Sequence, residues 1–434
     1  MPSVQFIRVG LPALQRAKVI ASDDLLVSDL DGLEIGRLLR GDICRVYPGE
    51  PARFSSVDVL SEPPGREALA GLEPFTRRLY LREPGGRDLY HGGGGVVLEI
   101  RKWRLELGGV RFHGPITIEG LPVGRGFPWE FQENATFLGE TEIIPWIRGL
   151  LRPINIVEIE DYIASVVGSE IGGSAPFEAQ KAQAVAARST LFATYGSHHI
   201  LGPFGICSED HCQVYRGRGS ETPESRRASD ETKGLVLVYE GDVVDARFSK
   251  CCGGITEEFR GAWEDADVPY LISRADGDYQ FPIETEDDAI NFIENPPPAN
   301  CSGSRNFRWE VRYSRQRLSE VVLARSGQDI GAILEITPLA RGKSGRITRL
   351  ALRGERGEMI LSPELEIRRV LSETYLNSSC FHVLKEESGF VIRGAGWGHG
   401  VGMCQEGAVK MAEDGKDFRD ILGFYYPGAE VARI

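Results

Sequence analysis

A glutamate at the end of an expected helix is the residue best placed for acid–base chemistry in this sequence. Glu170 stands just before Gly172-Gly173, where a helix over residues 160–169 should stop. A carboxyl group beside a glycine break, in a partly apolar cleft, can have a raised pKa and act as a general acid. The plainer interpretation is an ordinary capped helix pair with a solvated glutamate, and spacing alone does not decide between the two.

Two cationic residues follow on the next helix, which alanine-rich composition predicts over residues 177–194. Lys181 and Arg188 are seven positions apart and therefore share one helix face. We expect both side chains to point into the same groove as Glu170, where they would hold carboxylate or hydroxyl groups of a substrate. Their predicted role is substrate binding.

A cluster of histidines and cysteines comes next, within HHILGPFGICSEDHC. The possible ligands are His198, His199, Cys207, His211 and Cys212. Two thiolates and two imidazoles can close a tetrahedral zinc site, although the spacing is not that of a zinc finger. A disulfide between the two cysteines, or free thiols beside a core histidine, would also fit the pattern.

Alternating glycines from Gly394 to Gly402 form a second unusual stretch, close to the C-terminus. Glycine permits backbone angles that other residues avoid and allows a ligand to approach closely. His399 lies within this stretch and Gln405 just beyond it, and we expect both to line the cleft as substrate-binding groups. A glycine-rich core turn with a satisfied histidine is the plainer alternative.

Four ordered blocks resemble the stage II sporulation protein D / amidase enhancer LytB family. They are DYIASVVGSEIGGSAPFEAQKAQAVAARS from Asp161, HCQVYRG from His211, CCGGITEEF from Cys251 and GAGWGHGVGMCQEGAVKMA from Gly394. The resemblance runs from about Ile154 to the C-terminus, and its order makes it more specific than any single block.

This resemblance implies a peptidoglycan lytic transglycosylase that acts on glycan strands stripped of stem peptides. Family members use one glutamate, which matches Glu170, and release a 1,6-anhydro-muramic acid end. Zinc-bearing members suggest a structural zinc ion on the residues that match their pattern, namely His199, Cys207, His211 and Cys212. This chain departs from many members at residues 171–173, where Ile-Gly-Gly replaces a Met-Pro sequence.

The family also contains amidase enhancers, so two further functions stay open. The chain could be a non-catalytic enhancer of a cell-wall N-acetylmuramoyl-L-alanine amidase, or a zinc-stabilised glycan-binding module. An intact Glu170 in a cleft with Lys181 and Arg188 would favour the enzyme. The substrate class implies an extracytoplasmic location, in the periplasm or cell envelope.

The remaining sequence predicts an α+β protein. Residues 1–150 read as strands separated by Gly, Pro and Asp, with no catalytic constellation, and residues 151–434 form the domain that resembles the family. The acidic, proline-rich stretch 274–306 reads as an inserted surface segment. Trp263 and Tyr270 could stack on sugars or pack in a core.

Composition excludes several partners. A net charge of −13 with no basic stripe argues against nucleic acid. The sequence contains no run of 18 apolar residues, so it predicts no transmembrane helix. The first twenty residues lack the apolar segment of a signal peptide. Gly-Lys-Ser at residues 342–344 lacks the upstream glycine of a phosphate-binding loop, so we expect no nucleotide.

The cysteines do not form a recognisable disulfide framework. Cys251 or Cys252 could bridge to Cys301, or all three could be thiols. Three others, Cys44, Cys380 and Cys404, are predicted to be small buried apolar residues.

Overall fold

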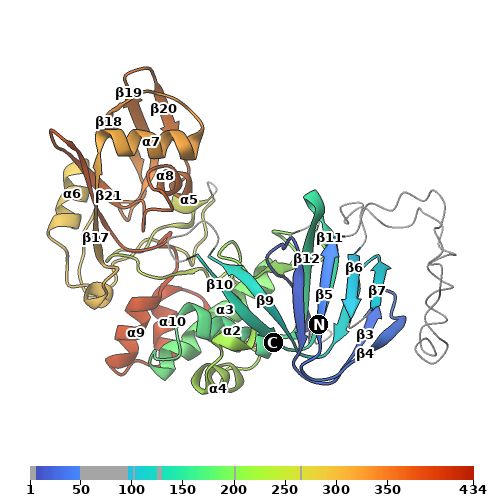
Figure 1. Cartoon of the computed structure of the whole chain (residues 1–434). Coiled ribbons are helices and arrows are strands. Elements are labelled where there is room, and N and C mark those ends of the chain that lie inside the picture. Colours follow the sequence, from blue (N-terminus) through green and yellow to red (C-terminus); the bar gives the residue numbers. More distant parts are fainter. Residues whose placement is uncertain (1–5, 49–95, 101–102, 125–129, 200–201, 264–265) are drawn as a thin grey trace, which may run out of the picture. The chain divides into compact units, whose positions relative to one another are not determined.

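The computed structural model of the protein describes residues 6–48, 96–100, 103–124, 130–199, 202–263 and 266–434 (Figure 1). The chain divides into two compact units. Unit 1 comprises residues 1–125, 129–169 and 194–226, and unit 2 comprises residues 126–128, 170–193 and 227–434. The predicted domain boundary near residue 150 falls at the start of a strand within unit 1. The glycine run at residues 91–95 lies outside the described residues.

Unit 1 is built on two sheets, as the alternating N-terminal pattern predicts. The seven-stranded sheet has the order β13-β1-β12-β11-β8-β3-β4. Its strands are β1 (Phe6–Gly10), β3 (Leu25–Asp29), β4 (Glu34–Leu38), β8 (Val110–His113), β11 (Glu140–Trp146), β12 (Leu150–Glu158) and β13 (Ile206–Cys207). The six-stranded sheet has the order β10-β9-β2-β5-β6-β7. Its strands are β2 (Ala17–Ala21), β5 (Ile43–Pro48), β6 (Val96–Ile100), β7 (Trp103–Leu107), β9 (Ile116–Val123) and β10 (Phe131–Phe137).

The first sheet leads directly to the residues of interest. Strand β12 pairs antiparallel with β1 and β11 and continues into helix α2 (Ile159–Glu170). At the other side of β1, the short parallel strand β13 places Cys207 opposite Gly10. Helix α2 buries Tyr162, Ile163, Val166 and Val167, the apolar stripe that its sequence predicts.

Unit 2 contains most of the helices of the described chain. Helix α3 (Phe177–Thr194) has the predicted bounds, and α4 (Pro223–Glu231) follows it across the division between the units. The other helices are α5 (Phe259–Ala262), α6 (Glu286–Glu294), α7 (Arg315–Ser326), α8 (Glu364–Val370), α9 (Gln405–Glu413) and α10 (Phe418–Tyr425). Short 3-10 turns are η1 (Ile147–Gly149), η2 (Gly217–Ser220) and η3 (Asn300–Gly303).

Four small sheets complete unit 2. Their orders are β15-β14-β24, β16-β23, β17-β22-β21 and β18-β19-β20. In Figure 1, α7 and α8 lie beside the hairpin strands β18 to β20. The strands are β14 (Leu235–Tyr239), β15 (Asp242–Val243), β16 (Phe248–Ser249), β17 (Arg308–Ser314), β18 (Ile333–Arg341), β19 (Ile347–Gly354), β20 (Glu358–Leu361), β21 (Phe381–Lys385), β22 (Gly389–Ala395), β23 (Met403–Cys404) and β24 (Glu430–Arg433).

The main core of unit 2 joins segments that are distant in sequence. Ala182, Val185 and Ala186 of α3 belong to one buried cluster with Met403 and Ala408. Because alanine side chains are small, α3 can approach the start of α9 closely. This packing brings the two glycine-flanked blocks of the sequence together.

The segment 274–306 differs from the prediction of an inserted surface segment. Its helix α6 buries Ala289, Phe292 and Ile293, and Ala299 and Cys301 lie in the main core. Acidic residues dominate the exposed face of α6, and for this reason the composition of the stretch resembles that of a surface segment. Within the described residues, no helix combines the length and apolar character needed to cross a membrane.

Candidate functional site

Glu170 ends helix α2 and lies beside two glutamines. The Nε2 of Gln405 donates to Glu170 Oε2 at 3.4 Å and to Gln183 Oε1 at 3.2 Å. Gln405 is only 2% exposed and Gln183 is fully buried, whereas Glu170 is partly buried. The structure therefore brings the predicted Glu170 and Gln405 together and adds Gln183 to them.

The two buried glutamines of α3, Gln180 and Gln183, make different contacts. Gln180 donates from Nε2 to the Ala175 carbonyl at 2.8 Å and to the Gly173 carbonyl at 3.3 Å, so it holds the loop that follows Glu170. Gln183 Nε2 is buried and has no hydrogen-bond partner within the described part of the chain. A buried donor without an acceptor is costly.

Lys181 contacts two glutamates and a phenylalanine. Its Nζ lies 2.6 Å from Glu178 and 3.9 Å from Glu231, and 4.9 Å from the ring centre of Phe418. These contacts join α3 to α4 and α10. The substrate-binding role of Lys181 stays a prediction.

Arg188 has the contacts of a core residue. It is 0% exposed and donates to the carbonyls of Leu235 at 3.0 Å and Ser229 at 3.3 Å. A buried guanidinium engaged in this way ties α3 to the start of β14. Contact with a substrate would require Arg188 to break these hydrogen bonds, which would cost free energy. The spacing of Lys181 and Arg188 in the sequence does not indicate this cost.

The glycine-rich loop is held by a buried arginine that sequence reasoning missed. Arg346 is 0% exposed and donates to the carbonyls of Gly398 at 3.3 Å and Cys252 at 3.2 Å. A Cβ on Gly400, whose φ is +78°, would lie 2.3 Å from Arg346 Cζ. Only glycine fits this position, because any side chain would collide with the guanidinium.

A buried carboxylate supports the same loop. Glu257 is 0% exposed and accepts from the Ser344 hydroxyl at 2.6 Å. Burial raises the pKa of Glu257, while the Ser344 hydrogen bond and the charge of Arg346 act in the opposite direction. In the sequence, Glu257 is a glutamate shortly after the Cys-Cys-Gly-Gly turn, and this pattern is too common to identify a functional residue.

His399 lies in the glycine-rich loop, as predicted, and packs on an aromatic ring. Its ring centre is 4.8 Å from that of Trp263, and its Nδ1 accepts from the Val401 amide at 3.0 Å. Burial, followed by the charges of Arg247 and Arg346, lowers the pKa of His399 to about 3. The imidazole is therefore neutral near pH 7. Trp263 is 40% exposed, and the Arg247 guanidinium lies 4.8 Å from the centre of its ring.

The four predicted zinc ligands come together in unit 1. One ligand atom from each of His199, Cys207, His211 and Cys212 lies within 4.8 Å of the others. Three measured separations are 3.3 Å (His199 Nε2 to Cys212 Sγ), 3.5 Å (Cys212 Sγ to His211 Nδ1) and 3.9 Å (Cys207 Sγ to His211 Nδ1). A tetrahedral zinc site would give about 3.6 Å between sulfur and nitrogen ligands. The donor set therefore fits a zinc ion.

The close group contains His199 and not its neighbour His198. The neighbouring His198 is exposed and lies outside the close group, with its Nδ1 at 3.9 Å from Cys212 Sγ. The pKa of the Cys207 thiol is lowered to about 3, chiefly by its hydrogen bond with Cys212 and then, against burial, by His211. No disulfide joins Cys207 to Cys212 in the described part of the chain.

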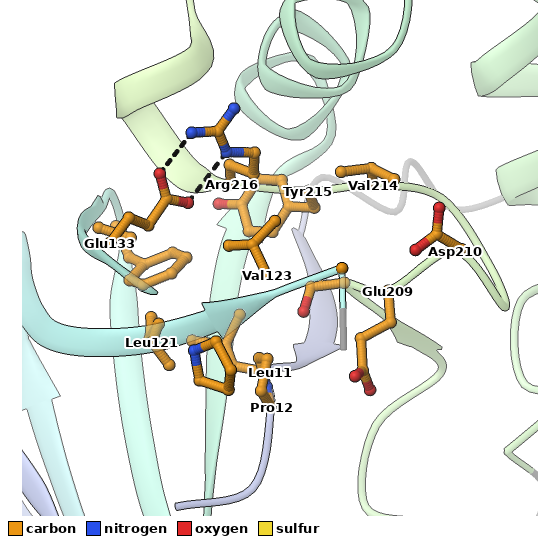
Figure 2. A pocket seen from close by; sticks show the side chains of 15 residues that line it. Leu11, Pro12, Leu121, Val123, Glu133, Glu209, Asp210, Val214, Tyr215 and Arg216 are labelled. Carbon is orange, nitrogen blue, oxygen red and sulfur yellow. Dashed lines mark hydrogen bonds and ion pairs between the residues drawn. The ribbon is translucent and has the colours of Figure 1, made fainter. Parts of the chain in front are cut away.

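A small pocket lies next to this cluster in unit 1. Its volume is about 40 Å³, and its walls include Leu11, Val123 and Tyr215 (Figure 2). Figure 2 shows Glu133 and Arg216 paired on one side of the pocket, with Arg216 Nη2 and Glu133 Oε2 at 2.5 Å. Typical ligand sites measure about 300–1,000 Å³, so this pocket is too small for a disaccharide.

Two family models match the chain. A model described as Stage II sporulation protein matches residues 148–239, which include Glu170, α3 and the predicted zinc ligands. A model for a domain of unknown function matches residues 257–402. The first match contains Glu170 and Gln183, and the second ends three residues before Gln405.

Several curated proteins are similar over most of the chain. An uncharacterised protein of Brachyspira hyodysenteriae is 32% identical over 317 residues, which are 70% of this chain and 76% of its own length. Stage II sporulation protein D of Bacillus subtilis is 25% identical over 305 residues, 67% of this chain and 78% of that protein. An amidase enhancer of Bacillus subtilis is 30% identical over 291 residues, 61% of this chain but 39% of the enhancer.

Proposed function

Because the chain belongs to the stage II sporulation protein D and amidase enhancer family, we propose that it is a peptidoglycan lytic transglycosylase with Glu170 as its single acid–base residue. The observation that carries the proposal is the hydrogen bond from Gln405 to Glu170, together with the bond from the same Gln405 Nε2 to Gln183. The expected substrate is a glycan strand stripped of stem peptides, in the periplasm or cell envelope.

One carboxyl group can perform both halves of this reaction. As an acid, Glu170 gives its proton to the glycosidic oxygen while the bond from that oxygen to C1 of muramic acid breaks. As a base, the resulting carboxylate takes the proton of the sugar's own 6-hydroxyl, which attacks C1. The product is a 1,6-anhydro ring, no water is consumed, and Glu170 is protonated again. A glycosidase with two carboxylates would instead need a second acidic residue at a set distance.

The neighbouring amides can assist this cycle. Gln405 donates to the carboxylate and orients it, and Gln183 accepts from Gln405 through its Oε1 and so holds Gln405 in place. His399 is neutral near pH 7 and lies on a partly exposed tryptophan ring, an arrangement that suits contact with a sugar. Lys181 and Arg188 stay predictions as substrate-binding residues.

We also propose a structural role for a zinc ion on His199, Cys207, His211 and Cys212. Four protein ligands leave no open position for a water nucleophile, and the ion would contribute folding free energy instead. It would tie the edge strand β13 to the turn at residues 211–212.

The products of digestion test the proposed activity. The purified chain is incubated with intact peptidoglycan and with glycan strands freed of peptides by an amidase, and the products are analysed by mass spectrometry. We expect anhydro-muramic acid ends, lighter by one water than hydrolysed ends, from the peptide-free strands. Hydrolysed ends only, or no cleavage of either substrate, would contradict the proposal.

The name of one relative supports a second candidate function. The Bacillus subtilis protein called an amidase enhancer shares 30% identity with this chain. If the chain acts in that way, it should accelerate a cell-wall N-acetylmuramoyl-L-alanine amidase without cleaving glycan itself. Adding the chain to an amidase digest distinguishes the two, because an enhancer would still act after Glu170→Gln.

A further inference from the structure

A second cluster of sulfur and oxygen ligands lies in the core of unit 2. Cys252, Asp276, Cys301 and Cys404 come from four separate segments, and each side chain is at most 1% exposed. One ligand atom from each residue lies within 4.8 Å of the others. The sequence predicted either a bridge to Cys301 or plain buried thiols, and it placed neither Asp276 nor Cys404 beside them.

The separation of two of these sulfurs agrees with that of two thiolates bound to one metal ion. The Sγ atoms of Cys252 and Cys301 are 3.7 Å apart. Two thiolates at about 2.3 Å from a tetrahedral zinc ion would be about 3.8 Å apart. A disulfide would need about 2.0 Å, and all eight cysteines are free thiols in this structure.

Backbone amides surround the sulfurs with donors. Cys404 Sγ accepts from the amides of Cys252 at 3.2 Å and Gly407 at 3.4 Å, and Cys252 Sγ accepts from the Gly254 amide at 3.4 Å. Cys404 also occupies the N-cap of α9, where the helix dipole favours a negative charge. Hydrogen bonds to sulfur of this kind stabilise thiolates, the form that binds metal.

Asp276 is oriented by its own set of donors. Its Oδ1 accepts from the Tyr425 hydroxyl at 2.7 Å, and its Oδ2 accepts from the Cys301 amide at 3.0 Å. Each carboxylate oxygen has two lone pairs, so Oδ2 keeps one for a metal ion. Partners of this kind fix the ligands of metal sites and tune them.

Charge gives the last argument. Burying three thiolates and a carboxylate together is unfavourable unless a cation balances them. Arg308, which donates to the Gly253 carbonyl at 2.8 Å, supplies one positive charge beside the group. A divalent ion with a preference for sulfur would add two positive charges and, with Arg308, would reduce the net charge of the fully deprotonated group to about −1.

We propose that Cys252, Asp276, Cys301 and Cys404 bind a zinc ion with a structural role, separate from the histidine and cysteine group of unit 1. The ion would join the Cys-Cys-Gly-Gly turn, the 274–306 segment and the start of α9. Because Gln405 follows Cys404 directly, the same ion would fix the residue that donates to Glu170. The proposal does not depend on the catalytic role of Glu170.

Metal content of the purified chain tests this proposal. The full chain is purified without chelator and with a reducing agent, and zinc is measured by elemental mass spectrometry in wild type, Cys301→Ser, Cys207→Ser and Cys380→Ser. We expect two zinc ions per wild-type chain, one in Cys301→Ser, one in Cys207→Ser and two in Cys380→Ser. Cys380 is the matched control, because it is buried in the same unit and lies outside the ligand group.

The wild-type measurements keep the test valid if a variant does not fold. Zinc X-ray absorption of the two-site protein should give an average of about 2.5 sulfur ligands per zinc, against 2 for the first site alone. Two results would overturn the proposal. One is wild-type zinc that disappears entirely with Cys207→Ser, and the other is a Cys252–Cys301 disulfide in protein kept under reducing conditions. If only the proposed zinc site of unit 1 is wrong, the wild-type chain should hold one zinc ion, and Cys301→Ser should remove it.

Discussion

Gln405 donates a hydrogen bond from its Nε2 to Glu170 Oε2 over 3.4 Å, although the two residues are 235 positions apart in the sequence. The bond joins the end of α2 to the first residue of α9. Both residues were predicted to line one cleft, and their contact is the arrangement on which the proposed chemistry depends.

Loss of this bond should slow catalysis without unfolding the chain. We expect Gln405→Ala to lower kcat/KM on peptide-free glycan about 10-fold, since a hydrogen bond to a charged group contributes about 1.5–3 kcal/mol and this one is long. Gln316→Ala is the matched control, because Gln316 makes a similar bond to Glu320 at 3.0 Å on the exposed face of α7. Equal activity of the two variants would show that Gln405 does not contribute to catalysis.

Removal of one ligand should weaken the metal site of unit 1. We expect Cys207→Ser to lower the zinc content and the melting temperature together, because such a site binds metal only in the folded state. Cys44→Ser provides the control, since Cys44 is also buried in unit 1 and lies outside the ligand group. Unchanged zinc content in Cys207→Ser, or a disulfide between Cys207 and Cys212, would rule out the assignment.

His399 predicts a dependence of stability on pH. Its pKa is about 3 in the folded chain, below the ordinary value of 6.5, mainly because of burial. Between these values the unfolded chain holds a proton that the folded chain lacks, so stability is full above pH 6.5 and falls as the pH drops toward 3. Its contribution to the slope is at most about 1.4 kcal/mol per pH unit. Urea unfolding from pH 7 to 4 should show a smaller loss for His399→Gln than for wild type, and parallel curves would contradict this.

Gly400 and Gly415 form a matched pair for the glycine-rich loop. Their φ values are +78° and +86°, but a Cβ on Gly400 would lie 2.3 Å from Arg346 Cζ, while Gly415 has open space around it. Gly415→Ala should therefore cost about 1–2 kcal/mol for backbone strain alone. Gly400→Ala should cost about 1–3 kcal/mol more, because the alanine collides with a packed arginine. Equal losses of unfolding free energy in the two variants, measured by chemical denaturation, would show that the loop adjusts to accommodate the added methyl group.

The local structure was largely predictable from the sequence. Helix α3 has the predicted bounds, because alanine favours helix and Pro176 marks its start. The α+β class also agrees with the structure, since alternating apolar residues form strands and the glycine breaks end helices. These features depend on neighbouring residues, which a sequence displays directly.

The long-range features were not predictable in this way. Lys181 and Arg188 share a helix face, yet Arg188 is enclosed by the core, because α3 packs close to its neighbours on more than one side. The role of Gln183 depends on Gln405, which only the fold brings near. Asp276 lies in an acidic stretch that looked solvated, and its burial follows from contacts with Tyr425 and Cys301.

The rate of glycan cleavage by Glu170→Gln tests the central claim most directly. The amide keeps the shape of the side chain but cannot cycle a proton, and acid–base catalysis contributes about 10²–10⁴-fold to rates. Wild type, Glu170→Gln and Glu224→Gln are compared on peptide-free glycan strands, with Glu224 as an exposed glutamate on α4. We predict that only Glu170→Gln loses the formation of anhydro ends, by about 10²-fold or more. Cleavage by Glu170→Gln at the wild-type rate would contradict the account.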